Sequence, residues 1–230
     1  MFESFEKRSL EPERLDLGKY TAAEYALWQK EIRFVHRILG EMRALTRTLV
    51  KEAAASGDQN LSILDVGAGS GDLLIALGRR LGAKDAFLVA ADLNIEALGS
   101  IKNTNAHITA VGCNSMRLPF ADNSFDYSFS TLFLHHLADD DAIRFLKEID
   151  RVTLRKFFVV DLHRHAASYY LYRLIGTIFL QRFTLEDGAL SIRKSFRPDE
   201  LRRLVQSAGI DNVRIKRSAA FRLILSGGNG

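Results

Sequence analysis

A glycine-rich turn between an apolar run and a helical run constrains the fold of this chain more than any other feature. The run Ile63-Leu64-Asp65-Val66 predicts a buried strand, and glycines follow at positions 67, 69 and 71 before a helical pattern opens at Asp72. Glycine lets the backbone turn tightly here and approach a ligand with no Cβ in the way. The order strand, glycine loop, helix therefore predicts an α/β fold with a binding site at the end of this strand.

Short apolar runs continue to alternate with helical patterns along the rest of the chain, which is typical of βαβ units in a parallel sheet. We expect strands at 61–66, 86–91, 107–111, 127–130 and 157–161, and helices at 72–81, 95–101 and 140–152. A helix that begins at Pro198 and two final strands near 213–216 and 221–225 complete the pattern. The predicted fold is a Rossmann-like, seven-stranded, mostly parallel sheet with flanking helices.

The N-terminal part differs from this pattern. Residues 1–20 are polar and irregular, and Thr21 with Glu24 forms a capping box for a helix with one apolar face. A further helical pattern spans 42–55. We therefore divide the chain into an N-terminal arm and helical cap at 1–56 and a main domain at 57–230, with a helical insert at about 164–195.

Composition narrows the class of protein. The single cysteine, Cys113, excludes a disulfide framework and a multi-cysteine metal cluster. A net charge of +4 is too small to indicate nucleic acid by itself. The first residues lack the pattern of a secretory signal, and the apolar stretch 166–180 is shorter than the roughly 20 residues of a spanning helix. We expect a cytoplasmic protein.

The glycine loop also discriminates between two classes of cofactor. A dinucleotide fingerprint has its third glycine three positions after the second, where this chain has Asp72. A carboxylate at that point would repel a pyrophosphate, whereas Asp65 suits a ligand with an ammonium group. Asp92 ends the next strand. Such a residue alone is most often a helix cap, but beside this loop we interpret it as binding ribose hydroxyls, with Leu93 packing on a flat base.

Taken together, these motifs resemble those of the class I S-adenosylmethionine-dependent methyltransferases. The resemblance is strong over Leu61 to Asp161 and includes the linker 116–126. The run Phe133-Leu134-His135-His136-Leu137 is similar to the subgroup of quinone-biosynthesis and other small-molecule C- and O-methyltransferases. A looser resemblance of the whole chain to methyltransferases found beside bacterial polyketide synthases favours a phenolic or quinone lipid as the acceptor.

The resemblance implies that S-adenosyl-L-methionine is the cofactor, and it implies residue roles. Asp65 would contact the methionine ammonium, directly or through water, and Asp92 would bind the ribose hydroxyls. The residues that would shape the loop beneath the amino-acid portion are Gly67, Ala68, Gly69 and Gly71.

Three further positions follow from the same resemblance. Asn114 and Ser115 would face adenine, and Thr131 would line the methionine side. The family often has Asp where this chain has Asn114, but an Asn carbonyl also accepts a hydrogen bond from the adenine amino group. Members of this subgroup need no metal, and we see no metal-ligand spacing in the sequence.

Histidines follow the fourth and fifth strands, where an acceptor would sit. Methyl transfer from a sulfonium depends on positioning, and a phenol or enol acceptor also needs a base, for which histidine suits neutral pH. His135 and His136 follow the fourth strand, and His163 and His165 follow the fifth. A capped or solvated loop histidine is the commoner role for each. As catalytic residues we favour His136 first and His163 second.

The predicted function is methyl transfer to O or C of a small aromatic, quinone or lipid-like acceptor. Ser130-Thr131-Leu132-Phe133 stands where amino-group methyltransferases have an Asn/Asp-Pro-Pro-aromatic motif, which argues against DNA as acceptor. An RNA methyltransferase and a non-catalytic cofactor-binding regulator are the alternatives.

Two features of the C-terminal half leave the choice of acceptor open. The aromatic-rich segment 166–180 is either a lid over the site or an ordinary helix on the sheet edge. A group of basic residues forms either a solvated face or a patch for an anionic membrane surface. Its members are Arg193, Lys194, Arg197, Arg202 and Arg203.

Overall fold

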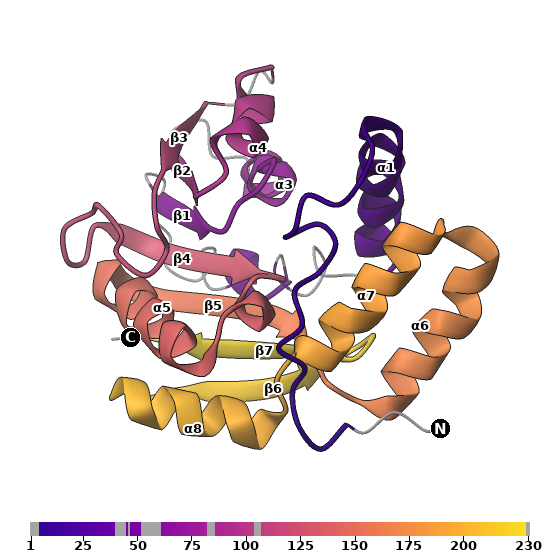
Figure 1. The fold of residues 1–230 in the computed structure, drawn as a ribbon. Coiled ribbons are helices and arrows are strands. Elements are labelled where there is room, and N and C mark those ends of the chain that lie inside the picture. The colour runs from indigo at the N-terminus through magenta and orange to yellow at the C-terminus, as the bar shows by residue number, and fades with distance from the viewer. Residues whose placement is uncertain are drawn as a thin grey trace.

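A computed structural model describes residues 5–39, 45, 47–51, 61–81, 86–103 and 107–228. A seven-stranded sheet of order β3-β2-β1-β4-β5-β7-β6 runs through the molecule (Figure 1). The strands are β1 (Ser62–Val66), β2 (Phe87–Asp92), β3 (Ile108–Gly112), β4 (Phe125–Thr131), β5 (Thr153–Leu162), β6 (Arg214–Ser218) and β7 (Arg222–Gly227). β1 to β5 pair in parallel and β7 is antiparallel to both of its neighbours. The predicted Rossmann-like sheet is confirmed.

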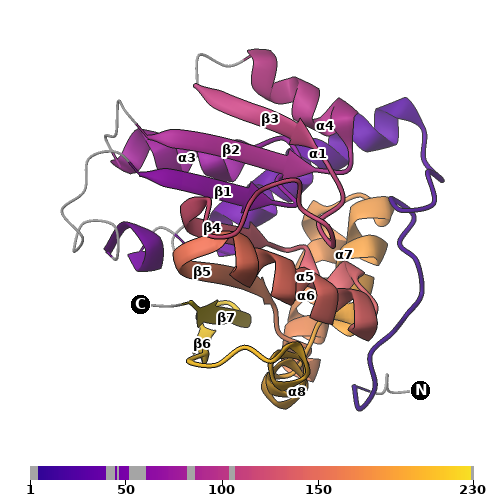
Figure 2. The ribbon, with the colours of Figure 1, turned by 90° about the vertical axis from the view of Figure 1, so that its left-hand side faces the viewer.

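The order of the strands fixes where a ligand can bind. β1 pairs with β2 on one side and β4 on the other, so the chain changes direction across the sheet between these strands. Ligands of open parallel sheets bind at the carboxyl ends of the strands beside such a switch point. Figure 2 shows β1, β2 and β3 side by side above β4 and β5.

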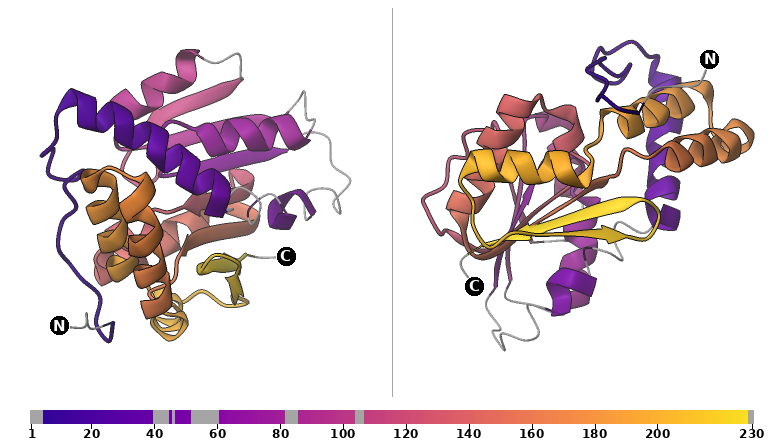
Figure 3. Two further views of the ribbon diagram at one scale, coloured as in Figure 1. Left: turned by 90° about the vertical axis from the view of Figure 1, so that its right-hand side faces the viewer. Right: turned by 90° about the horizontal axis from the view of Figure 1, so that it is seen from below.

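Residues on both sides of β1, β2 and β4 are largely buried, as expected of a parallel sheet with helices on both faces. α3 (Asp72–Leu81) and α4 (Ile95–Gly99), continued by the 3₁₀ helix η1 (Ser100–Asn103), pack on one face. α5 (Asp139–Val152) and α8 (Pro198–Ala208) pack on the other face (Figure 3). Pro198 is in the first turn of α8, as predicted.

α1 (Ala22–Leu39) begins at the predicted capping box. The N–H of Thr21 donates to Oε2 of Glu24 at 2.8 Å, and the N–H of Glu24 donates to Oγ1 of Thr21 at 3.2 Å. Most of the helix predicted at 42–55 lies outside the described residues, as does the turn at 56–60. Residues 45 and 47–51 are described and helical.

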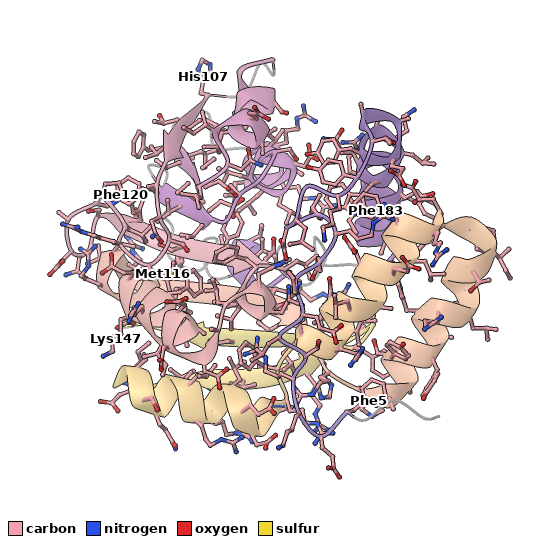
Figure 4. All side chains as sticks on the ribbon, in the orientation of Figure 1. Phe5, His107, Met116, Phe120, Lys147 and Phe183 are labelled. Atoms are coloured by element: carbon pink, nitrogen blue, oxygen red, sulfur yellow. The ribbon has the colours of Figure 1, made fainter. Side chains whose placement is uncertain are left out.

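The insert is a pair of helices. α6 (Ala166–Phe179) and α7 (Arg182–Lys194) form a hairpin at the edge of the molecule (Figure 1). Glycine allows the two helices to approach closely, since a Cβ at Gly188 would lie 2.1 Å from Oη of Tyr172. At the start of α7, Phe183 stacks with Tyr20 and Trp28 and so joins α7 to the arm and α1 (Figure 4).

Candidate cofactor and acceptor site

The loop after β1 is packed against protein at both ends and open in its middle. Gly67, Gly69 and Gly71 have φ of +76°, +54° and +72°, a region that favours glycine. A Cβ at Gly67 would lie 2.7 Å from the Phe133 ring, and one at Gly71 would lie 2.7 Å from Ile101. A Cβ at Gly69 would meet nothing within 4 Å. The centre of the loop therefore presents bare backbone to a ligand.

Asp92, at the end of β2, is tied to this loop. Its Oδ2 accepts from the N–H of Gly69 at 2.7 Å, and its Oδ1 accepts from the N–H of Asn94 at 2.8 Å. A carboxylate has about four acceptor positions, so both oxygens can still accept from hydroxyl groups. The N-cap of α4 is Asn94, so Asp92 does not serve as that cap. Leu93 follows with an exposed side chain.

Asp65 has a buried carboxyl group, one oxygen of which lacks a hydrogen-bond partner among the described residues. It is 2 % exposed, and its Oδ1 has no hydrogen-bond partner within the described part of the chain. Burial, and after it the charge of Asp92, raises the pKa of the Asp65 carboxyl well above its ordinary value. A buried polar atom without a partner is costly. An ammonium group bound beside Asp65 would satisfy it and favour its ionised form.

The segment after β3 lies next to Asp92, as the predicted adenine side requires. The N–H of Cys113 donates to the carbonyl oxygen of Asp92 at 3.0 Å. Oδ1 of Asn114 accepts from the N–H of Met116 at 2.9 Å, so this oxygen retains one acceptor position for a ligand. Thr131 is buried at the end of β4, the strand beside β1.

A histidine–aspartate pair lies where β4 and β5 end. η2 (Leu134–His136), a single 3₁₀ turn, places Nδ1 of buried His135 2.6 Å from Oδ1 of Asp161. Burial lowers the pKa of the His135 ring, so it is neutral near pH 7. Burial opposes the charge of Asp161, but the His135 ring and the N–H groups of Leu162 and His135 keep the pKa of Asp161 low. Asp161 thus selects the Nδ1–H tautomer and leaves Nε2 of His135 as an acceptor.

His136 faces acidic residues of the N-terminal arm. Its Nδ1 lies 3.7 Å from Oδ1 of Asp16 and 3.9 Å from Oε1 of Glu13. Although burial opposes the charged form, these carboxylates raise the pKa of His136. The hydrogen bond and charge of His136 in turn lower the pKa of Asp16. His135 and His136 therefore have adjacent rings, 4.2 Å between centroids, with opposite pKa shifts.

Lys194 supplies a positive charge to the same cluster. Its Nζ lies 3.2 Å from Oε1 of Glu13, 3.3 Å from Oδ2 of Asp16 and 3.5 Å from Nδ1 of His136. Glu13, His135 and His136 have ligand atoms within 4.8 Å of one another, a spacing compatible with a metal. The sequence alone could not reveal this group of three residues, because Glu13 is distant along the chain from the two histidines. Here the Lys194 ammonium lies against these groups and would repel a metal cation.

The arm forms one wall of a cavity of about 250 Å³ beside η2. Its lining residues are Arg8, Ser9, Leu10, Glu11, Pro12, Asp16, His135, His136, Leu137, Ala138 and Lys194. The Arg8 guanidinium donates to the carbonyl oxygens of His135 at 3.2 Å, Leu137 at 3.0 Å and Lys194 at 2.6 Å. These bonds hold the arm across the carboxyl edge of the sheet.

His163 lies in different surroundings. Its N–H donates to the carbonyl oxygen of Phe221, and its ring centroid lies 5.6 Å from that of His165. Burial, followed by the charges of His165 and Arg217, lowers the pKa of His163 to about 4. The ring of His136 thus lies beside that of His135, whereas the ring of His163 lies beside that of His165.

Five residues of this part of the site were not predicted as site residues, namely Arg8, Glu13, Asp16, Asp161 and Lys194, and His135 was a candidate that was not favoured. The interpretation of Lys194 as part of a solvated basic face is wrong, because its side chain pairs with two acids and is 5 % exposed. Arg202 and Arg203 are exposed, as that interpretation requires. Helical periodicity could have placed Lys194 on the inner face of α7, but no sequence signal connects it to the arm.

Comparisons with known proteins identify related methyltransferases. A family model described as "Methyltransferase domain" matches residues 63–156. A ubiquinone/menaquinone biosynthesis C-methyltransferase UbiE of Stenotrophomonas maltophilia is 32 % identical over 200 residues, which cover 77 % of this chain and 76 % of that protein. The corresponding protein of Xylella fastidiosa is 29 % identical over 204 residues, with the same shares covered.

Solved structures share the fold. The plantazolicin methyltransferase BpumL, in complex with a substrate analogue and SAH, has a TM-score of 0.68 at 14 % identity and covers 90 % of this chain and 91 % of its own. A SAM-dependent methyltransferase from Aquifex aeolicus has a TM-score of 0.56 at 18 % identity, covering 77 % of this chain and 88 % of its own.

Proposed function

Because this chain belongs to the class I S-adenosylmethionine-dependent methyltransferases, we propose that it methylates O or C of a lipophilic aromatic acceptor of the phenol or hydroquinone type. The chain is an enzyme of small-molecule methylation, and S-adenosyl-L-methionine is its cofactor. The relatives of ubiquinone and menaquinone biosynthesis favour a quinol-like ring. The observation that carries the proposal is the buried His135–Asp161 pair beside the cavity at η2.

The geometry of the loop supports a set of cofactor residues. S-adenosyl-L-methionine supplies a methyl group on a sulfonium when it is bound. We propose that Asp65 holds its ammonium and that Asp92 accepts from its ribose hydroxyls. The partnerless Oδ1 of Asp65 and the spare acceptor positions of Asp92 support these roles. The remaining residues proposed to line this half of the site are Gly67, Ala68, Gly69, Gly71, Leu93, Asn114, Ser115 and Thr131.

The two adjacent histidines would have different roles toward the acceptor, one as a base and the other as a hydrogen-bond donor. Neutral His135, oriented by Asp161, takes the hydroxyl proton at Nε2. His136 has a raised pKa and donates a hydrogen bond to the acceptor oxygen, which stabilises the developing negative charge. Loss of the proton raises the electron density on the oxygen and on the ring carbons ortho and para to it. Methylation of such a carbon is completed when that carbon loses its own hydrogen as a proton and the oxygen regains a proton from His135. Both O- and C-methylation are therefore compatible with this arrangement.

The arm with α1 and the α6–α7 insert would select the acceptor, in keeping with the predicted division at residues 56 and 164–195. They enclose the histidine pair from two sides, since Glu13 and Asp16 come from the arm and Lys194 from α7. We propose that a lipophilic acceptor enters between these elements. Contact with a membrane surface is part of this proposal, because an acceptor of that kind partitions into lipid.

An assay of a panel of short-chain hydroquinones and phenols tests the function. The purified enzyme is incubated with S-adenosyl-L-methionine, and products are identified by mass spectrometry as O- or C-methylated. We expect Asp161→Asn to lower turnover strongly, by no more than removal of the His135 ring itself, while S-adenosylhomocysteine binding by calorimetry persists. His163→Asn serves as the matched control and tests the prediction of a catalytic His163. Binding of the cofactor by the parent enzyme with no methylation anywhere in the panel would overturn the proposal.

A further inference from the structure

The outer face of α6 is apolar, whereas the outer faces of α5 and α8 are charged. Six of the fourteen large apolar side chains that are exposed within the described residues lie on this one helix. They are Tyr170, Leu171, Leu174, Ile175, Ile178 and Phe179. The exposed residues of α5 and α8 include Asp139, Asp140, Arg144 and Lys147, and Asp199, Arg202 and Arg203. A contiguous apolar surface of this kind marks an interaction site.

The inner face of α6 already has its partner. Tyr169 and Gly176 are buried, Gly176 packs against Leu185 of α7, and Oη of Tyr172 donates to the carbonyl oxygen of Thr184 at 2.8 Å. The exposed residues at 171, 174, 175 and 178 recur at helical spacing on the opposite side. Figures 1 and 3 show α6 as the outermost element on this side of the molecule. The outer face is thus available to another partner.

The apolar surface extends toward α1. The N–H of Gln181, in the turn after α6, donates to Oε1 of Glu31 at 2.9 Å, and its Nε2 donates to the carbonyl oxygen of Glu24 at 2.9 Å. Leu27 and Phe34 occupy the same stripe of α1, each three residues after one of these glutamates, and both are exposed. Two more apolar side chains therefore lie near the end of α6.

The charges around this surface are mainly positive. α6 contains no acidic residue, and its one charged residue is Arg173. Arg182 begins α7 with an exposed side chain that pairs with Glu186, and Lys30 and Arg33 are exposed beside Leu27 and Phe34. An apolar stripe with a basic rim is complementary to a lipid surface that carries anionic headgroups. A two-fold dimer through this face would instead bring the same basic residues of two copies together.

We propose that the outer face of α6, with Leu27 and Phe34 of α1, docks the enzyme on an anionic lipid bilayer. α6 has 14 residues, fewer than the roughly 20 that a spanning helix needs, so it would lie in the interface. No helix of the described part of the chain is long and apolar enough to cross a membrane. α6 follows the end of β5, where Asp161 lies, so docking would place the acceptor site next to the lipid. The docking face deepens the membrane contact included in the proposed function and rests on it for its purpose, but vesicle binding can be tested without knowing which acceptor is methylated.

Flotation with vesicles tests this surface. Phosphatidylcholine vesicles with and without phosphatidylglycerol are mixed with the full chain. We expect the parent chain to cofloat with the vesicles that contain phosphatidylglycerol. Leu174→Glu should lower the partitioning onto these vesicles by at least roughly tenfold, because a leucine that is 70 % exposed at the centre of the face is replaced by an anion. Leu154→Glu is the matched control, since Leu154 is 47 % exposed near the start of β5 and far along the sheet from α6. The partitioning of Leu154→Glu onto the vesicles should remain within twofold of that of the parent.

Three results would overturn the proposal. They are no cofloating of the parent chain, an equal loss in Leu154→Glu, and a concentration-dependent dimer by light scattering that Leu174→Glu abolishes. S-adenosylhomocysteine affinity and turnover of a water-soluble acceptor should be unchanged in Leu174→Glu, which shows that the variant is folded. Failure of methyl transfer with vesicle binding intact would instead count against the proposed acceptor class alone.

Discussion

The two halves of the site are built in different ways. The proposed cofactor half consists of the turns that directly follow β1, β2 and β3 together with Thr131 at the end of β4, and each of its residues lies within a few positions of the end of a strand. The acceptor half gathers Glu13 and Asp16 from the arm, His135 and His136 from η2, and more distant residues from β5 and α7. The first half depends on local chain geometry, whereas the second requires the arm to close over a completed sheet. Substitutions should therefore affect the halves differently.

The largest expected effect separates chemistry from cofactor binding. His135→Asn should lower kcat by roughly 10²- to 10⁴-fold, because the neutral acceptor atom oriented by Asp161 is lost. S-adenosylhomocysteine affinity should remain within a few-fold, since His135 lies outside the cofactor half. Steady-state kinetics and calorimetry on the same preparation measure both quantities. A parallel loss of affinity and kcat would show that the two halves are not independent.

The next effect concerns the cofactor half. Asp65→Asn should weaken S-adenosylhomocysteine binding by roughly 100-fold, because a buried charge partner of the ammonium is removed. Asp72→Asn, at the start of α3 in the same loop, is the control and should change affinity little. The pKa of Asp65 is raised in the free protein, so binding to the parent should release protons. Calorimetry in buffers of different ionisation enthalpy detects that release, and its persistence in Asp65→Asn would contradict the assignment.

Two glycines of one loop should respond differently. Gly67→Ala should cost about 2–3 kcal/mol of stability, since its Cβ would lie 2.7 Å from the Phe133 ring and the backbone has a positive φ. Gly69→Ala should cost about 1 kcal/mol of stability from its positive φ alone. Relative to that loss of stability, it should weaken cofactor binding more than Gly67→Ala does. Urea unfolding and calorimetry give the two numbers. Equal ratios of affinity loss to stability loss would argue against a ligand at Gly69.

The smallest effect is a pH dependence of stability. The raised pKa of Asp65 means that the folded state holds its proton more tightly than the unfolded chain, so ionisation costs stability as pH rises above the unfolded value near 3.9. Asp65→Asn removes that cost. The melting temperature of Asp65→Asn should therefore rise relative to that of the parent as the pH increases from acid to neutral, by a few degrees at pH 7. A constant difference across this range would exclude Asp65 as the source.

What the sequence by itself determined is the part of the molecule governed by short-range rules. The strand–glycine–helix pattern predicted the sheet and the places of Asp65 and Asp92, because parallel strands align their carboxyl ends at one edge. The capping box at Thr21 and Pro198 at the start of α8 were predictable for the same reason, since each depends on neighbours within one turn.

Only the tertiary structure decided how the acceptor half is composed. His135 and His136 are adjacent in sequence, but one is oriented by Asp161 of β5 while the other faces Glu13 and Asp16 of the arm. Lys194 belongs to this cluster and not to a solvated face, because burial beside two carboxylates is favourable only after α7 and the arm have come together. The surroundings of His163 likewise depend on Phe221, in the turn between β6 and β7, and on Arg217 of β6, which no local pattern encodes.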